Sequence, residues 1–173
     1  KFYQDNGYLL VKRLLDLEYI EEMFSTLVKL VKLYGGKLVE PYDRLKSWEE
    51  DDFNELLIKL RQQDKNRFSA LYEAASRSLS LSNICFSKGI TKYVSAILDS
   101  TPDSLSTQSF FLRIDPPFDR RNAYGWHQDS SYNEYNLREN SIVSWIPMTS
   151  VSAKNGSIKI CKMSHREGII PFK

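Results

Sequence analysis

Residues 107–115 read TQSFFLRID, and their alternation decides which kind of fold the sequence favours. Positions 110, 112 and 114 carry Phe, Leu and Ile, whereas positions 111, 113 and 115 carry Phe, Arg and Asp. Successive side chains of a strand point to opposite faces, so this spacing predicts a strand with one apolar face. Pro116 and Pro117 follow directly and end the strand, because proline cannot donate to a ladder of backbone hydrogen bonds.

The sequence downstream predicts further strands joined by a tight turn. Residues 141–148, SIVSWIPM, and residues 157–161, SIKIC, are short and apolar. Residues 153–156 between them read AKNG, and the Asn-Gly pair favours a turn because glycine supplies the backbone freedom that a turn requires. The part of the chain from about residue 105 onward is therefore predicted to form a sheet or barrel.

The first hundred residues instead show helical spacing. In the first helix, predicted from Leu17, apolar residues follow steps of three and four; Asp16 is placed to cap its start, and Gly35-Gly36 to end it. Three more helices are predicted at about 49–62, 65–80 and 88–99, the last capped by Ser87. The residues expected to face inward are Leu17, Ile20, Phe24, Leu27, Val31 and Tyr34; Phe53, Leu56, Leu57 and Leu60; Phe68, Leu71, Tyr72, Ala75 and Leu79; and Ile90, Val94, Ile97 and Leu98.

Helices followed by strands define an α+β fold class, here in a single domain over residues 1–173. The helical portion covers about residues 1–100 and braces the strands of residues 105–173. Three or four strands do not close a barrel. We therefore expect the strand region to be incomplete at its C-terminus and the chain to continue beyond Lys173.

Composition and charge exclude several classes of partner. The 24 Lys and Arg residues nearly balance the 22 Asp and Glu residues, and the net charge of +2 predicts neither a nucleic-acid nor a membrane partner. No apolar run approaches the roughly 18 residues of a membrane-spanning helix. Cys85 and Cys161 lie far apart in the sequence, which suits a reducing compartment and predicts a cytoplasmic protein.

One short motif carries chemistry. Residues 126–129 read WHQD, so in a strand the imidazole of His127 and the carboxylate of Asp129 share one side. With a second histidine they would form the two-His, one-carboxylate triad of non-haem iron(II) oxygenases, which leaves positions open for a 2-oxo acid and dioxygen. In a chain of this composition, an HxD spacing arises by chance about one time in eight. The alternative is a surface histidine and aspartate that share a hydrogen bond.

The surroundings of the motif resemble the phytanoyl-CoA dioxygenase family of iron(II)/2-oxoglutarate-dependent oxygenases. The resemblance rests on WHQD at 126–129, on Trp145, on NGS at 155–157 and on SHREG at 164–168. The opening of the chain, KFYQDNGYLLVKRLLDLEYIEEM, is also similar to the family's opening, in which a short Gly-Tyr strand leads into a helix. Residues of about 40–100 match only in general character.

The resemblance implies a fold, a reaction and a set of site residues. The fold is a double-stranded β-helix (a cupin-like jelly roll), and the reaction hydroxylates a small organic substrate with dioxygen, Fe(II) and 2-oxoglutarate, releasing succinate and carbon dioxide. His127 and Asp129 become the iron ligands and catalytic residues. Trp145 is expected beside 2-oxoglutarate, and Gln128 near the cofactor or substrate. Arg113 is expected to pair with a carboxylate. Plain core packing of Trp145, and a solvated strand face for Arg113, are the alternatives.

The resemblance does not extend to two residues that the family needs, the second metal-binding histidine and an arginine that binds the far carboxylate of 2-oxoglutarate. Both normally follow the SHxxG element, and the sequence reaches Lys173 before them. His165 is the remaining histidine, but it occupies the SHxxG position, and we predict that it shapes a loop and does not bind the metal. Either the chain continues, or the fold has lost its metal site. A non-catalytic jelly-roll binding protein is therefore the competing interpretation.

Overall fold

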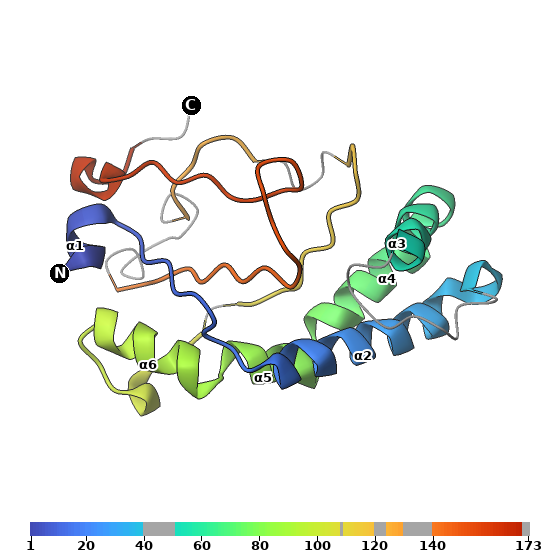
Figure 1. The fold of residues 1–173 in the computed structure, drawn as a ribbon, viewed down its shortest axis with the longest axis horizontal. Helices are drawn as coiled ribbons and strands as arrows, with labels where there is room; N and C mark the ends of the chain where they lie inside the picture. Colours follow the sequence, from blue (N-terminus) through green and yellow to red (C-terminus); the bar gives the residue numbers. More distant parts are fainter. Residues whose placement is uncertain (40–50, 108, 120–123, 130–139, 171–173) are drawn as a thin grey trace.

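A computed structural model describes residues 1–39, 51–107, 109–119, 124–129 and 140–170 of the chain. Its elements form two layers (Figure 1). One layer consists of the helices α2 to α6, and the other contains the mostly non-helical residues from about 105 onward together with the short α1. The α-helices are α1 (Phe2–Asn6), α2 (Leu17–Gly35), α3 (Asp51–Gln63), α4 (Lys65–Ser76), α5 (Leu79–Cys85) and α6 (Lys88–Ile97). The 3-10 helices are η1 (Gly36–Val39), η2 (Pro102–Ser104) and η6 (Ser164–Glu167).

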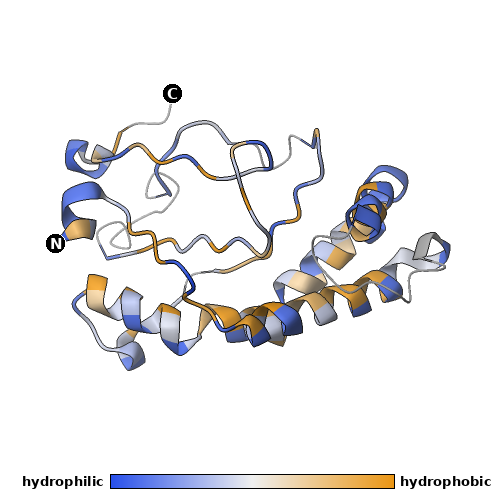
Figure 2. Cartoon of the chain, in the orientation of Figure 1, coloured by the Kyte–Doolittle hydropathy of each residue, from blue (hydrophilic) through white to orange (hydrophobic). Residues whose placement is uncertain are grey.

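The hydrophobic core lies in the helical layer. Helix α2 packs against α4 and α5, and α3 packs against α4. Figure 2 shows apolar residues concentrated along these helices. Burying one large aliphatic or aromatic side chain contributes about 1.5–3 kcal/mol, so this cluster is the main source of stability among the described residues. Its buried members are Met23, Phe24, Leu27, Val31, Phe53, Leu56, Leu57, Leu60, Phe68, Leu71, Ala75, Leu81, Ile84, Ile90 and Leu112.

The predicted helices at 17–34 and 49–62 are confirmed, and so are most of the residues predicted to be buried on them. In α2 the buried stripe includes Phe24, Leu27 and Val31, and all four inward positions predicted for α3 are buried. Leu17 was predicted to face inward, which is wrong. It is the first residue of α2, and the described part of the chain leaves it 75% exposed.

The single helix predicted over 65–80 is wrong, because the chain breaks there into α4 and α5. Ser78 adopts an extended backbone conformation and caps α5, with its hydroxyl accepting a hydrogen bond from the Leu81 N–H at 3.2 Å. A serine at this position stabilises a new helix start by satisfying a free backbone donor. Leu79 opens the new helix on its outer side and is 81% exposed.

The second layer docks on the helices through alternate side chains. Leu112 is buried, and Phe110 and Ile114 pack against the same core, as the alternation predicted. The Ser76 hydroxyl at the end of α4 accepts from the Leu112 N–H at 3.2 Å and donates to the Leu112 carbonyl at 3.4 Å. The Ser76 side chain therefore pairs with both backbone groups of Leu112, which a neighbouring strand would otherwise do.

The segment 141–148 repeats this arrangement. Ile146 and Met148 pack against the core, whereas Val143 and Trp145 are exposed by 66% and 38%. No strand is assigned among the residues that the structure describes, although residues 109–115 and 145–148 alternate in burial as strands do. The jelly roll therefore stays a prediction.

The turn predicted at 153–156 is confirmed. The side-chain carbonyl of Asn155 accepts from the N–H of Ser152, and its amide donates to the Ser150 carbonyl at 2.8 Å. Gly156 has φ of 93°, a conformation that favours glycine. The Asn155 side chain therefore holds this turn through hydrogen bonds to Ser150 and Ser152.

Among the described residues, no helix combines the length and the apolar character needed to cross a lipid bilayer.

Candidate functional site

His127 and Asp129 lie side by side. The Nε2 atom of His127 is 3.2 Å from Oδ1 of Asp129, and the two side chains are 28% and 47% exposed. The ring of Tyr124 meets the imidazole edge to face, with centroids 5.7 Å apart. The imidazole and the carboxylate therefore present one nitrogen and one oxygen at a partly open surface.

The hydrogen bond on the other side of the imidazole decides which nitrogen can bind a metal. Nδ1 of His127 lies 2.8 Å from the carbonyl oxygen of Gly125. A carbonyl only accepts hydrogen bonds, so Nδ1 must carry the proton and donate. In the neutral imidazole the lone pair then resides on Nε2, the atom that faces Asp129. Gly125 thus sets the tautomer that metal coordination needs.

The spacing of this pair fits two adjacent ligands of one metal ion. Nitrogen and oxygen ligands lie roughly 2.1 Å from a first-row metal, and two of them at a right angle are about 3 Å apart. The observed separation of 3.2 Å is close to that value, and it is also the separation of a hydrogen bond between a protonated Nε2 and the carboxylate, so both interpretations of the pair fit this distance. The chemistry of the donors also fits iron(II), which combines imidazole and carboxylate ligands in facial triads.

Within the described ranges, no third His, Cys, Asp or Glu joins this pair to make a group of metal ligands. His165 lies instead against the N-terminal helix. One of its ring nitrogens, Nε2, is 2.8 Å from the carbonyl oxygen of Gln4, and a Cβ on Gly7 would collide with its Nδ1. The expectation that His165 shapes a loop and does not bind the metal stays a prediction.

Gln128 makes two hydrogen bonds to distant backbone. Its amide nitrogen donates to the Gly168 carbonyl at 2.9 Å, and its side-chain oxygen accepts from the Ile170 N–H at 2.7 Å. The side chain therefore pairs with residues 168–170 as a strand backbone does. Its predicted contact with cofactor or substrate stays a prediction.

Arg113 and Trp145 lie on the side of their segments that faces away from the buried residues. Arg113 forms an ion pair with Asp115 at 3.0 Å, and its side chain is 33% exposed. Trp145 alternates with the core-packed Ile146. Plain burial of Trp145 in the helical core is therefore not what the structure shows. The 2-oxoglutarate contacts expected of both residues stay predictions.

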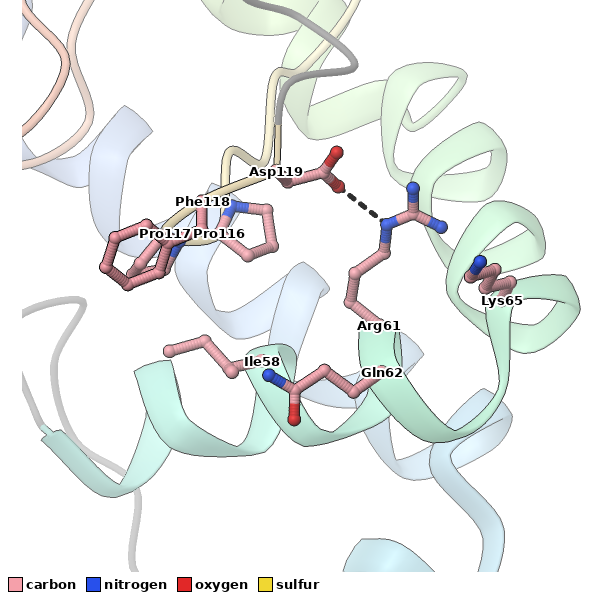
Figure 3. A pocket seen from close by; sticks show the side chains of 8 residues that line it. All are labelled: Ile58, Arg61, Gln62, Lys65, Pro116, Pro117, Phe118 and Asp119. Atoms are coloured by element: carbon pink, nitrogen blue, oxygen red, sulfur yellow. Dashed lines mark hydrogen bonds and ion pairs between the residues drawn. The ribbon is translucent and has the colours of Figure 1, made fainter.

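An open pocket of about 360 Å³ lies elsewhere, between α3 and the turn at 116–119. Figure 3 shows Arg61 reaching from α3 toward Asp119, and Nε of Arg61 is 2.6 Å from Oδ2 of Asp119. The guanidinium also lies over the ring of Phe68, with 5.5 Å to its centroid. Sequence reasoning missed this ion pair, because its two residues are 58 positions apart and share no motif.

Comparison with known proteins places the chain in a family. The family model for phytanoyl-CoA dioxygenase (PhyH) matches residues 3–172. The chain belongs to the phytanoyl-CoA dioxygenase family, as the residues at 126–129, 155–157 and 164–168 predicted. No curated protein and no solved structure matches it.

Membership of this family indicates the general type of reaction. Proteins of this family are typically iron(II)- and 2-oxoglutarate-dependent oxygenases that act with dioxygen on small molecules. His127 and Asp129 belong to the WHQD sequence at 126–129, which lies inside the matched residues, and one nitrogen and one oxygen at this spacing fit two ligands of an iron ion.

Proposed function

We propose that this chain forms part of an iron(II)/2-oxoglutarate-dependent dioxygenase that hydroxylates a small organic substrate. His127 and Asp129 supply two of the three protein ligands to the iron. The observation that carries the proposal is the 3.2 Å approach of Nε2 of His127 to Oδ1 of Asp129, in a chain that the family model matches over residues 3–172. The double-stranded β-helix proposed for residues 105–173 would surround this pair.

The residues of this chain perform the tasks of binding and orientation. The Gly125 carbonyl keeps the proton on Nδ1 of His127 and so leaves Nε2 as a ligand. The Asp129 carboxylate contributes negative charge, and the ring of Tyr124 contacts the imidazole edge to face. Bound iron together with 2-oxoglutarate supplies the oxidative chemistry, in which dioxygen is consumed and succinate and carbon dioxide are released.

Two further residues are proposed to face the cofactor. Arg113 offers a fork of donors that matches a carboxylate, and its ion pair with Asp115 holds it outside the helical core. Trp145 is 38% exposed on the corresponding side of its segment. Their shared orientation, away from the helices, supports a role at the inner face of the proposed barrel.

The test measures metal binding and turnover in the full-length protein. Anaerobic titration with iron(II), and with cobalt(II) as an air-stable probe, gives the affinity, and succinate release reports the reaction. Loss of a partner outside the ligand shell costs about 10–100-fold in metal affinity, so His127→Ala and Asp129→Ala should each cost more than about 100-fold. Asp103→Ala is the control, since Asp103 is exposed in η2.

Unchanged metal affinity in both ligand variants would overturn the assignment. A protein that binds the metal through both residues but releases no succinate with 2-oxoglutarate and dioxygen would instead favour the competing interpretation, a non-catalytic binding protein of the same fold.

A further inference from the structure

Three carbonyl groups at the C-terminal end of α1 receive hydrogen bonds from residues 163–166, far away in the sequence. A helix leaves its last carbonyl groups without partners inside the helix. In α1 three of them are met by residues 163–166: the Met163 N–H donates to the Asn6 carbonyl at 2.9 Å, His165 to Gln4 at 2.8 Å, and Arg166 to Asp5 at 3.1 Å. Figure 1 shows α1 and η6 side by side at one end of the second layer.

The chemistry of these contacts fits a dedicated cap. Carbonyl oxygens only accept, so Nε2 of His165 must carry a proton and donate. Arg166 brings positive charge to the negative end of α1 and also lies 3.9 Å from the Asp5 carboxylate. Gly7, with φ of 79°, leaves the space that the His165 ring occupies.

The same stretch is held at its other end beside the candidate metal ligands. Gly168 and Ile170 receive both hydrogen bonds of the Gln128 carboxamide, and Gln128 lies between His127 and Asp129 in the chain. Residues 163–170 therefore connect two places that are about 120 positions apart in sequence. Neither contact uses an atom of His127 or Asp129 that faces the metal position.

We propose that residues 163–170 act as a clamp that positions His127 and Asp129. In this clamp His165 fixes one end to α1, and Gln128 fixes the other end to the ligand segment. Gln128 is thus a positioning residue whose carboxamide is engaged by backbone. The expected effect of the clamp on metal affinity rests on the proposed function. The mechanical part of the proposal, that residues 163–170 connect α1 to the segment 127–129, is measured without metal.

The mechanical part is tested by hydrogen exchange of the metal-free full-length protein. Gln128→Leu removes both hydrogen bonds, and exchange of the Ile170 amide should rise about tenfold or more. His165→Phe keeps an aromatic ring at Gly7 but loses the donor to Gln4. It should raise exchange at 163–166 and also, through the clamp, in the peptide 124–129. His165→Gln restores a donor and should reverse the effect. Gln62→Leu on the exposed side of α3 is the matched control and should change neither region.

The consequence is measured as cobalt(II) affinity. Gln128→Leu should weaken it about 10–100-fold, as expected for a residue that orients a ligand from outside the ligand shell. His165→Phe should weaken it by a smaller factor, and His165→Gln should restore it. Weaker 2-oxoglutarate binding in Gln128→Leu, with Ile170 exchange and cobalt(II) affinity unchanged, would make Gln128 a cofactor ligand and overturn the clamp.

The two proposals fail in different ways. If His165→Phe accelerates exchange at 163–166 and leaves the peptide 124–129 as in the wild type, the clamp is wrong whatever the metal affinity. If exchange follows the prediction while His127→Ala and Asp129→Ala bind cobalt(II) as the wild type does, the metal assignment is wrong and the clamp stands as a structural connection.

Discussion

At the scale of single residues, two serines at the starts of helices differ in what their hydroxyl groups do. Ser78 caps α5 by accepting from the Leu81 N–H. Ser87 stands at the same position before α6, but its buried hydroxyl has no hydrogen-bond partner among the described residues. We expect Ser78→Ala to lower the free energy of unfolding by about 1 kcal/mol. Ser87→Ala should be neutral or stabilising, because it removes a buried polar atom without breaking a bond.

Urea denaturation followed by circular dichroism measures both serine variants. An equal loss of stability in the two would show that Ser87 also caps its helix. The sequence predicted a cap at Ser87 and overlooked the one at Ser78, since a serine before an apolar run looks the same whether or not its hydroxyl bonds the backbone. Only the folded backbone distinguishes the two cases.

The two cysteines should differ in reactivity. Burial raises the pKa of the Cys85 thiol above its ordinary value, because desolvation disfavours the charged thiolate. Cys161 is exposed. A raised pKa leaves less thiolate near neutral pH, and the thiolate is the nucleophile. We therefore expect iodoacetamide to alkylate Cys161 first and Cys85 slowly until the protein unfolds, as peptide mass spectrometry would show. Comparable rates in the native protein would contradict the raised pKa of the partly buried Cys85 thiol.

At the scale of elements, the Arg61–Asp119 ion pair joins α3 to the turn at 116–119. Its side chains are only 20% and 15% exposed, whereas Lys59 and Glu55 form an exposed pair within α3. A double-mutant cycle with Arg61→Met and Asp119→Asn should give a coupling of about 1–3 kcal/mol. The matched cycle on the exposed pair should give no more than about 0.5 kcal/mol. Equal couplings would mean that partial burial does not strengthen the Arg61–Asp119 ion pair.

Elements differed in how well the sequence predicted them. Helix α3 was predicted with its whole buried face, because its apolar spacing and its first-turn Asp51 and Asp52 agree with one another. The break between α4 and α5 was missed, since apolar spacing continues across residues 77–78 and the new cap is only one serine. The face of 107–115 that packs on the helices was predicted correctly, because alternation alone fixes which side chains share a face.

The candidate site shows the same limit. The local spacing of His127 and Asp129 was readable, because two residues apart in the chain can meet at one metal ion. The partners of Gln128 and His165 lie 40 and 161 positions away and depend on how α1, η6 and the ligand segment come together. Hydrogen bonds to backbone leave no side-chain pattern in the sequence, so these contacts could not be predicted from it.

At the scale of the whole molecule, Leu112 connects the two layers. It is 6% exposed in a core otherwise made by helices α2 to α6, and its backbone pairs with Ser76 of α4. We expect Leu112→Ala to cost about 2–5 kcal/mol, the range for a leucine removed from a packed core. If the layers unfold as one unit, the substitution should shift two unfolding transitions by the same amount. One is followed by the circular dichroism of the helices, and the other by the fluorescence of Trp126 and Trp145. The measurement uses a Trp48→Phe background, so that fluorescence reports only the second layer.

Val143→Ala supplies the control for that experiment, because Val143 is 66% exposed on the side of its segment away from the core. It should change stability by less than about 0.5 kcal/mol. A Leu112→Ala protein whose tryptophan transition moves while its helical transition stays in place would show that the helical layer is stable alone. In that case the helices would serve as a preformed support on which the segment carrying His127 and Asp129 folds separately, and metal binding would stabilise that second layer without raising the stability of the first.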